Sequence, residues 1–445
     1  MSGCLLYRKT LSSMRGTQSN MTNASCAHAT EVPPFAQVAA VLAEVTETLA
    51  CELTSATQEP PPWADLEWRI ARAVAAMQGV SSLLSASLLW EAPMNWRRFL
   101  RKQRDHTARR HLRIVNLLER IDTQARLEGV ALVALKGAAL YQRGLYEVGE
   151  RPMADVDLLV RDFDTNAVTR LLLACDFDLT FVTWRHQLYE SRVGAASAAG
   201  FGEHSDNPIK IEVHTNIRER LPVTETDITQ FLFPTEPHVG LNAYRSAAAL
   251  MLHLLLHAAG NMRARALRLI QLHDISRLAN RFHVCDWEEL LAFHPNDQDL
   301  WWAVPPLSLT ARYFPNAIPE WVLTRLRRRC PWLLRKFTSH YRLSDVSWSN
   351  PRVYAFPGVE WSRSLGEVCR FAIGRVWPSR EALLELRHYA ATQPGVSEIP
   401  WYGISHAARI LRWLASKPPR VQTMLSVRAA LGKRCDADCC SDATE

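Results

Sequence analysis

Two aspartates separated by one valine open an apolar run in the stretch RPMADVDLLV. Residues i and i+2 of a strand point the same way, so Asp155 and Asp157 would present two carboxylates to one small volume. Two bare carboxylates that close repel each other and are costly to bury. Mg²⁺ favours sites with one or two carboxylates plus substrate phosphates, and metal pairs serve in-line phosphoryl transfer. The spacing therefore indicates a metal site, and the alternative is an aspartate pair that caps turn amides.

A Lys-Gly pair follows the apolar stretch VALVAL. Glycine between a strand and a helix brings backbone N–H groups to a helix N-terminus, which is a natural phosphate site. Lys136 adds a positive charge beside Gly137, and Arg151 comes just before the aspartate strand. The pattern predicts an anion-binding turn, although a plain glycine-terminated strand gives the same letters.

A third acid lies in the alternating stretch NPIKIEVHTNI. Ile209, Ile211 and Val213 share one face of the predicted strand, whereas Glu212 and His214 share the other. If this strand lies beside the aspartate strand, Glu212 supplies a third carboxylate. His214 would orient Glu212, or it is an ordinary strand histidine.

The elements that must position these residues form a small α/β unit. We expect strands at 130–135, 151–160, 178–183 and 207–217, with helices at 138–146 and at 165–175. Gly129 ends the helical pattern that precedes the first strand. The order strand, helix, strand, helix, strand, strand is typical of a small mixed sheet packed on helices. The predicted fold class is α+β, with this core embedded in a mostly helical chain of several domains.

The rest of the chain is divided by composition and by proline-marked breaks. The expected segments are a disordered leader (1–30), a helical region (31–125), the α/β core (126–235), a helical domain (236–340), a C-terminal helical region (341–430) and a cysteine-containing tail (431–445). In the tail, Cys435, Cys439 and Cys440 are candidates for binding a soft metal or for oxidation.

Two further patterns carry charge or metal-binding side chains. The helix NWRRFLRKQRDHTARRHLR is strongly basic, which indicates either a solvated face or the recognition of phosphate or RNA. His253 and His257 stand four residues apart on a predicted helix, and His273 and Asp274 follow. An HxxxH pair with an added carboxylate can hold zinc, but histidines that hydrogen-bond inside a helical core are the alternative.

Composition places few restrictions on function. The chain has 445 residues, a formal charge of +7 and a pI of about 8.9, which permits an anionic partner without requiring one. Ten cysteines without a CxxC pair indicate a reducing compartment, and we expect a cytoplasmic protein. The longest apolar stretch, 247–260, is too short to span a bilayer and predicts a buried core helix.

The order of these motifs resembles the nucleotidyltransferase superfamily that includes DNA polymerase β. More specifically, LKGAALYQRGLY followed by RPMADVDLLV is similar to the uncharacterised nucleotidyltransferase family of bacteria. IEVHTNI resembles the strand of that family in which a histidine follows an acid, and HLLLHAAGNMRARALRLIQLHDISRLA resembles its downstream helix pair. The resemblance covers residues from about 110 to 290.

The resemblance implies roles for the residues that match the motifs. Asp155 and Asp157 match the metal-binding pair, and Glu212 matches the third acid, which helps activate the attacking hydroxyl. Gly137 matches the glycine of a Gly-Ser turn, but Ala138 stands where many members have serine. The strongest catalysts carry aspartate at the position of Glu212.

We therefore expect a Mg²⁺-dependent (or Mn²⁺-dependent) nucleotidyltransferase that moves a nucleoside monophosphate from an NTP such as ATP to an acceptor hydroxyl and releases pyrophosphate. Lys136, Gly137 and Arg151 would bind the triphosphate. The acceptor is open: a small molecule, a sugar, a protein or RNA. The alternative is a non-catalytic module that binds nucleotide, RNA or protein. A third hypothesis is a helical metalloprotein built on His253, His257 and Asp274.

Overall fold

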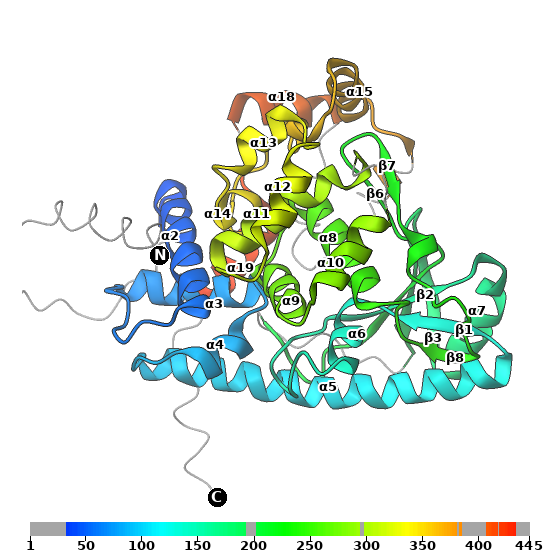
Figure 1. Ribbon diagram of the computed structural model, residues 1–445. Coiled ribbons are helices and arrows are strands. Elements are labelled where there is room, and N and C mark those ends of the chain that lie inside the picture. Colours follow the sequence, from blue (N-terminus) through cyan, green and yellow to red (C-terminus); the bar gives the residue numbers. More distant parts are fainter. Residues whose placement is uncertain are drawn as a thin grey trace, which may run out of the picture.

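A six-stranded mixed sheet adjoins a larger helical assembly (Figure 1). The structure is a computed structural model that describes residues 33–192, 202–293, 298–380, 382–384, 406–416 and 418–432. The predicted leader and the tail from residue 433 onward, with its three cysteines, lie outside the described residues. The α+β fold class, with a sheet core in a mostly helical chain, is confirmed.

The sheet has the strand order β3-β4-β5-β2-β1-β8, and a separate two-stranded ribbon joins β6 to β7. All four predicted strands are present as β1, β2, β3 and β5, whereas the sequence patterns did not predict β4, β8 or the ribbon. The strands are β1 (Ala131–Ala134), β2 (Asp155–Val160), β3 (Phe177–Val182), β4 (Gln187–Ser191), β5 (Lys210–His214), β6 (Arg218–Arg220), β7 (Glu225–Asp227) and β8 (Gly240–Asn242).

Helices precede, interrupt and follow the strands. Those before and within the sheet are α2 (Phe35–Thr54), α3 (Asp65–Met77), α4 (Ser81–Ser87), α5 (Met94–Glu128), α6 (Lys136–Gln142) and α7 (Thr165–Ala174). Those after it are α8 (Ala247–Arg263), α9 (Leu269–Ala279), α10 (Val284–Ala292), α11 (Val304–Tyr313), α12 (Glu320–Arg327), α13 (Trp332–Thr338), α14 (Leu343–Val346), α15 (Leu365–Val376), α18 (His406–Ser416) and α19 (Val421–Gly432).

The two faces of the sheet bury different sets of alternating side chains. Val156 and Leu158 of β2 and Ile211 and Val213 of β5 join one apolar cluster with α5 and α7. Leu159, which points the other way, belongs to a second cluster that contains α8 and the other helices of the helical assembly. Because a one-residue slip would turn each strand over, this burial fixes which residues face the helical assembly.

The C-terminal half of helix α5 supports the sheet. The helix runs for 35 residues along the lower side of the molecule in Figure 1, and Trp96 and Leu100 of its N-terminal half pack in the helical assembly instead. Its apolar residues Ile114, Leu117 and Ile121 pack into the sheet cluster. Gly129 ends it in the left-handed conformation, with φ at 71°, as the sequence predicted.

The helical assembly surrounds α8, whose side chains are buried on almost all sides. The prediction of a buried core helix over residues 247–260 is confirmed. Buried residues from α2 through α19 share one apolar cluster, so segments from both ends of the chain pack together. In the described part of the chain, no helix is both long and apolar enough to cross a membrane.

Candidate active site

The three predicted acids lie on two adjacent strands. β2 and β5 pair in parallel, with Asp157 opposite Glu212 and Asp155 opposite Lys210. Neighbouring strands lie about 4.8 Å apart, and the apolar partners of these acids point toward α5. Asp155, Asp157 and Glu212 therefore project from the same face of the sheet, toward the helical assembly.

The lysine of the Lys-Gly turn reaches the second aspartate. Lys136 Nζ lies 2.8 Å from Asp157 Oδ1, and the two side chains are only 19% and 5% exposed. Lys136 has a φ of 47°, which is uncommon for a residue with a side chain. Its N–H donates to the Tyr244 hydroxyl at 3.2 Å, and the N–H of Leu135 donates to the Asp157 carbonyl at 2.9 Å. These contacts hold the turn against β2.

Gly137 is required because Arg151 lies over it. A Cβ at Gly137 would stand 2.5 Å from Arg151 Nη1 and 2.9 Å from Met153 Cγ, which is closer than real Cβ contacts come. The other two nitrogens of Arg151 donate to both oxygens of Asp274 at 2.8 Å. Arg151 is thus already paired with Asp274, and its Nη1 edge is the part that faces the turn.

Ala138 stands where many members of the superfamily have a serine, and its surroundings show why a hydroxyl is absent here. Its side chain is 5% exposed and packs in the apolar cluster between the sheet and α5. A serine in this backbone position would direct its hydroxyl into that cluster. The structure therefore places Ala138 in the core.

Two histidines flank Glu212. His214 Nε2 lies 3.1 Å from Asp157 Oδ1 and 3.7 Å from Glu212 Oε2, so its nearest acid is Asp157. His186 Nδ1 lies 3.7 Å from the same Glu212 oxygen. His186 could not be recognised from the sequence, because its position depends on the hairpin that joins β3 to β4.

A family model described as an uncharacterised nucleotidyltransferase matches residues 64–294. The chain belongs to this family. No curated protein and no solved structure matches it. The matched residues include the three acids and the Lys-Gly turn, and membership supports nucleotidyl transfer as the general activity of this protein.

The three acids carry more formal negative charge than the one ammonium beside them offsets. Burial and the charge of Asp157 raise the pKa of Asp155, and burial together with Asp157 and Asp155 raises the pKa of Glu212 to about 8. Burial also opposes ionisation of Asp157, but Lys136 and His214 outweigh it and hold its pKa well below the usual range. Burial alone would lower the pKa of Lys136, yet the three acids raise it.

These residues suit a divalent cation. Among the described residues, the Asp155 carboxylate has no hydrogen-bond or ion-pair partner, although its side chain is partly buried. Carboxylate oxygens are ligands of the kind that hard cations take, although among the described residues the ligand atoms of the three acids do not all lie within 4.8 Å of one another. The chemistry of the donors, rather than their present spacing, therefore fits the divalent metals that nucleotidyltransferases generally use.

One arginine of the basic helix α5 hydrogen-bonds to the main chain just before both strands that carry the acids. Arg110 is 3% exposed, and its guanidinium donates to the carbonyls of Met153 and Ala154 at 2.7 Å. It also donates to the carbonyls of Asn207 and Pro208 at 2.6 and 3.1 Å. These carbonyls lie just before β2 and β5, so Arg110 fixes the starts of the two strands relative to each other.

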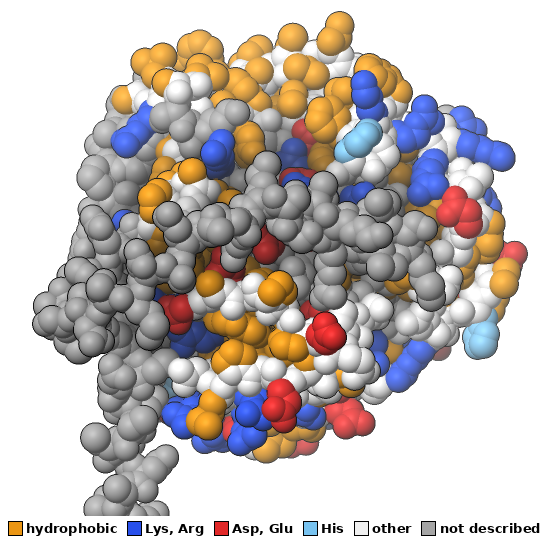
Figure 2. Space-filling model, turned by 90° about the vertical axis from the view of Figure 1, so that its left-hand side faces the viewer, with side chains coloured by type: hydrophobic (Ala, Val, Ile, Leu, Met, Phe, Trp, Pro, Cys, Tyr) orange, Lys and Arg blue, Asp and Glu red, His pale blue; other side chains and the backbone are white. Residues whose placement is uncertain are grey.

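Other basic residues of α5 face solvent. Arg97, Arg98 and Arg101 are exposed. The lower edge of the molecule in Figure 2, where α5 runs in Figure 1, carries Lys and Arg side chains interspersed with acidic and apolar ones. This mixture matches a solvated face, and recognition of RNA by this helix stays a prediction.

The two histidines of the HxxxH pair hydrogen-bond to separate partners in the helical assembly. His253 Nδ1 lies 2.7 Å from the Tyr244 hydroxyl, and His257 Nε2 lies 3.2 Å from Asn261 Nδ2. Asp274 is engaged by Arg151. In the described ranges, these residues form no group of metal ligands. These contacts agree with the alternative of histidines that hydrogen-bond inside a helical core, and they give the zinc hypothesis no support, because each side chain has a different partner.

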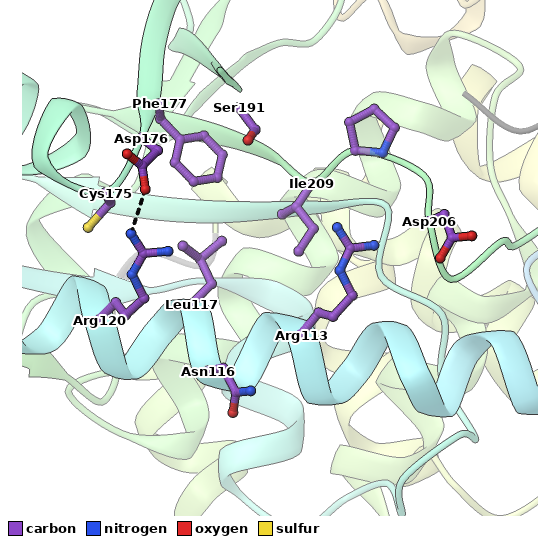
Figure 3. A pocket seen from close by; sticks show the side chains of 11 residues that line it. Arg113, Asn116, Leu117, Arg120, Cys175, Asp176, Phe177, Ser191, Asp206 and Ile209 are labelled. Atoms are coloured by element: carbon purple, nitrogen blue, oxygen red, sulfur yellow. Dashed lines mark hydrogen bonds and ion pairs between the residues drawn. The ribbon is translucent and has the colours of Figure 1, made fainter. Parts of the chain in front are cut away.

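A separate pocket lies away from the acids (Figure 3). It has a volume of about 490 Å³, and Arg113 and Arg120 of α5 point into it beside Asp206 and Asp176. Arg120 pairs with Asp176 at 2.9 Å. Phe177, which also lines it, belongs to the cluster on the α5 side of the sheet, opposite the face that carries the acids.

Proposed function

We propose that this protein transfers a nucleoside monophosphate from an NTP to an acceptor hydroxyl and releases pyrophosphate. The observation that carries the proposal is the parallel pairing of β2 with β5, which sets Asp157 opposite Glu212 on the face that Lys136 also reaches. Family membership agrees with it. The acceptor class remains a small molecule, a sugar, a protein side chain or RNA.

Mg²⁺ or Mn²⁺ would be held by Asp155, Asp157 and Glu212, and it would offset the charge of the triphosphate. Asp155 is the carboxylate best suited to receive it, because the described residues leave Asp155 without a partner. Asp157 would exchange part of its contact with Lys136 for the cation. The ammonium of Lys136 would then be available to a phosphate oxygen of the bound nucleotide.

The chemistry requires one bond to form and one to break. The acceptor oxygen bonds to the α-phosphorus, and the bond from that phosphorus to the bridging oxygen breaks, so pyrophosphate leaves. Glu212 accepts the hydroxyl proton. Lys136 and the Nη1 edge of Arg151, which donates to the Pro152 carbonyl at 3.3 Å, stabilise the leaving pyrophosphate. Most of the acceleration would come from positioning and charge stabilisation, as in other phosphoryl transfers.

The alternative is a module that binds nucleotide without turnover. Glu212 favours it, since the strongest catalysts of the superfamily carry aspartate at this position. Calorimetric titration with ATP, with and without Mg²⁺, measures binding without any acceptor. Binding without transfer to any acceptor class would support the module over the enzyme.

The proposal is tested with NTP labelled at the α-phosphate and a panel of sugars, small polyols, protein and RNA. The wild type is expected to transfer label in the presence of Mg²⁺ or Mn²⁺. Asp157→Ala is expected to lose both transfer and metal-dependent NTP binding. Asp162→Ala is the matched control, because Asp162 is an exposed aspartate just beyond β2. Unchanged activity in Asp157→Ala would overturn the proposal.

A further inference from the structure

Two imidazoles and a carboxylate converge beside the acid pair. Nδ1 of His186 and Nε2 of His214 each lie 3.7 Å from Glu212 Oε2, and ligand atoms of the three residues all fall within 4.8 Å of one another. The two rings have their centroids 5.4 Å apart. Over the part of the chain that the structure describes, this is the one such group of three metal-ligating side chains.

The spacing suits a small divalent ion. Nitrogen and oxygen ligands stand about 2.0–2.2 Å from zinc, so tetrahedral geometry separates neighbouring ligand atoms by about 3.4 Å. The two measured separations from Glu212 exceed this by only a few tenths of an ångström. Small side-chain rotations would bring the atoms to bonding distance.

The ligand types favour a transition metal over magnesium. Mg²⁺ takes oxygen ligands, whereas imidazole nitrogen suits zinc, cobalt and related ions. Two histidines and one glutamate leave a coordination position open, as in catalytic rather than structural zinc sites. His214 Nε2 also lies 3.1 Å from Asp157 Oδ1, so a bound ion would take the place of that contact, while Asp157 keeps Lys136 as its partner.

Hydrogen bonds in the turn before β4 hold His186 in place. The turn before β4 is closed by the N–H of Thr183 donating to the His186 carbonyl at 2.9 Å, and by the N–H of His186 donating to Thr183 Oγ1 at 3.0 Å. β4 then pairs with β5, with Leu188 opposite Glu212. The hairpin therefore carries His186 to the strand that bears the other two ligands.

We propose that His186, Glu212 and His214 bind one divalent transition-metal ion of the zinc class. The site is an addition to the oxygen site of Asp155 and Asp157, with which it shares Glu212. It does not rest on the proposed transfer reaction, because the metal alone is the ligand.

Cobalt is the probe, because its visible absorption reports its ligands. Full-length protein stripped with a chelator is titrated with Co²⁺ in the presence of excess Mg²⁺. The wild type is expected to bind one equivalent with nitrogen and oxygen ligation, and His186→Gln to bind at least about tenfold more weakly. His214→Gln should behave alike. The control is His106→Asn, whose ring stacks on His204 outside the group.

Cysteine ligation is recognised by sulfur charge-transfer bands in the near ultraviolet. Cobalt bound only through thiolates, or bound equally well by wild type and His186→Gln, would overturn the proposal. Matching thermal unfolding of the variants in chelator shows that they are folded. Nucleotidyl transfer with Mg²⁺ in a protein that binds no cobalt would overturn only the proposed site of His186, Glu212 and His214. Cobalt binding without nucleotidyl transfer would count only against the proposed function.

Discussion

Replacing Arg110 by methionine would remove the donor that joins the starts of the two acid strands. Each hydrogen bond from a charged group contributes about 1.5–3 kcal/mol net, and Arg110 makes four such bonds to main-chain carbonyls. Because the four share one guanidinium that is itself costly to bury, their sum overstates the effect. We expect Arg110→Met to lower the free energy of unfolding by about 4 kcal/mol.

The neighbouring arginine provides the control. Arg109 is exposed on the same helix turn, so Arg109→Met should change the free energy of unfolding by less than about 0.5 kcal/mol. For a cooperative unit the size of the family match, about 4 kcal/mol corresponds to a fall in the melting temperature of roughly 8–16 °C. The change for Arg109→Met should stay below about 2 °C.

The assay is thermal unfolding followed by circular dichroism, combined with calorimetry of metal-dependent NTP binding at a temperature where both variants are folded. Folded Arg110→Met should also bind NTP more weakly, because the acids of β2 and β5 are no longer held in one arrangement. Equal melting temperatures for Arg110→Met and Arg109→Met would refute the reasoning that one guanidinium fastens the two strands.

Two more perturbations test the surroundings of the site. Gly137→Ala should displace Arg151 and weaken metal-dependent NTP binding, as measured by calorimetry. The control is Gly374→Ala, which should leave the NTP affinity unchanged because nothing lies within 4 Å of the new Cβ. Equal NTP affinities for the two variants would refute the close packing at Gly137. Burial lowers the pKa of His273 from 6.5 to about 4. As the pH falls, this histidine therefore takes up a proton in the unfolded chain before it does so in the folded one. The free energy of unfolding should drop by about 3 kcal/mol between pH 6.5 and 4. The melting temperature of His273→Gln should fall less steeply than that of the wild type over this pH range. Identical dependence of the two melting temperatures on pH would contradict this role of His273.

The acid strands could be predicted because their evidence is local. Alternation of Ile211 and Val213 with Glu212 shows the buried face of β5, and the same period places Asp155 and Asp157 on one face of β2. The structure then supplied the pairing of the two strands. Their metal-binding roles stay predictions.

The partners of the site could not be predicted, because they depend on contacts distant in sequence. Arg151 meets Asp274 across 123 positions, and Arg110 reaches carbonyls up to 98 positions away. Arg110 has the same sequence context as its solvent-exposed neighbours on the helix. The position of His186 depends on the pairing of β4 with β3 and β5, which no turn motif in the sequence predicted. Such contacts leave no period or spacing in the sequence.

A crystal structure with Mn²⁺ and a non-hydrolysable NTP analogue, recorded with anomalous scattering from manganese, tests the proposed metal site most directly. We expect a manganese peak within coordination distance of Asp155 and Asp157, with the triphosphate beside Lys136. Manganese and nucleotide bound elsewhere, such as in the pocket between α5 and β3, with the acids unchanged, would contradict it.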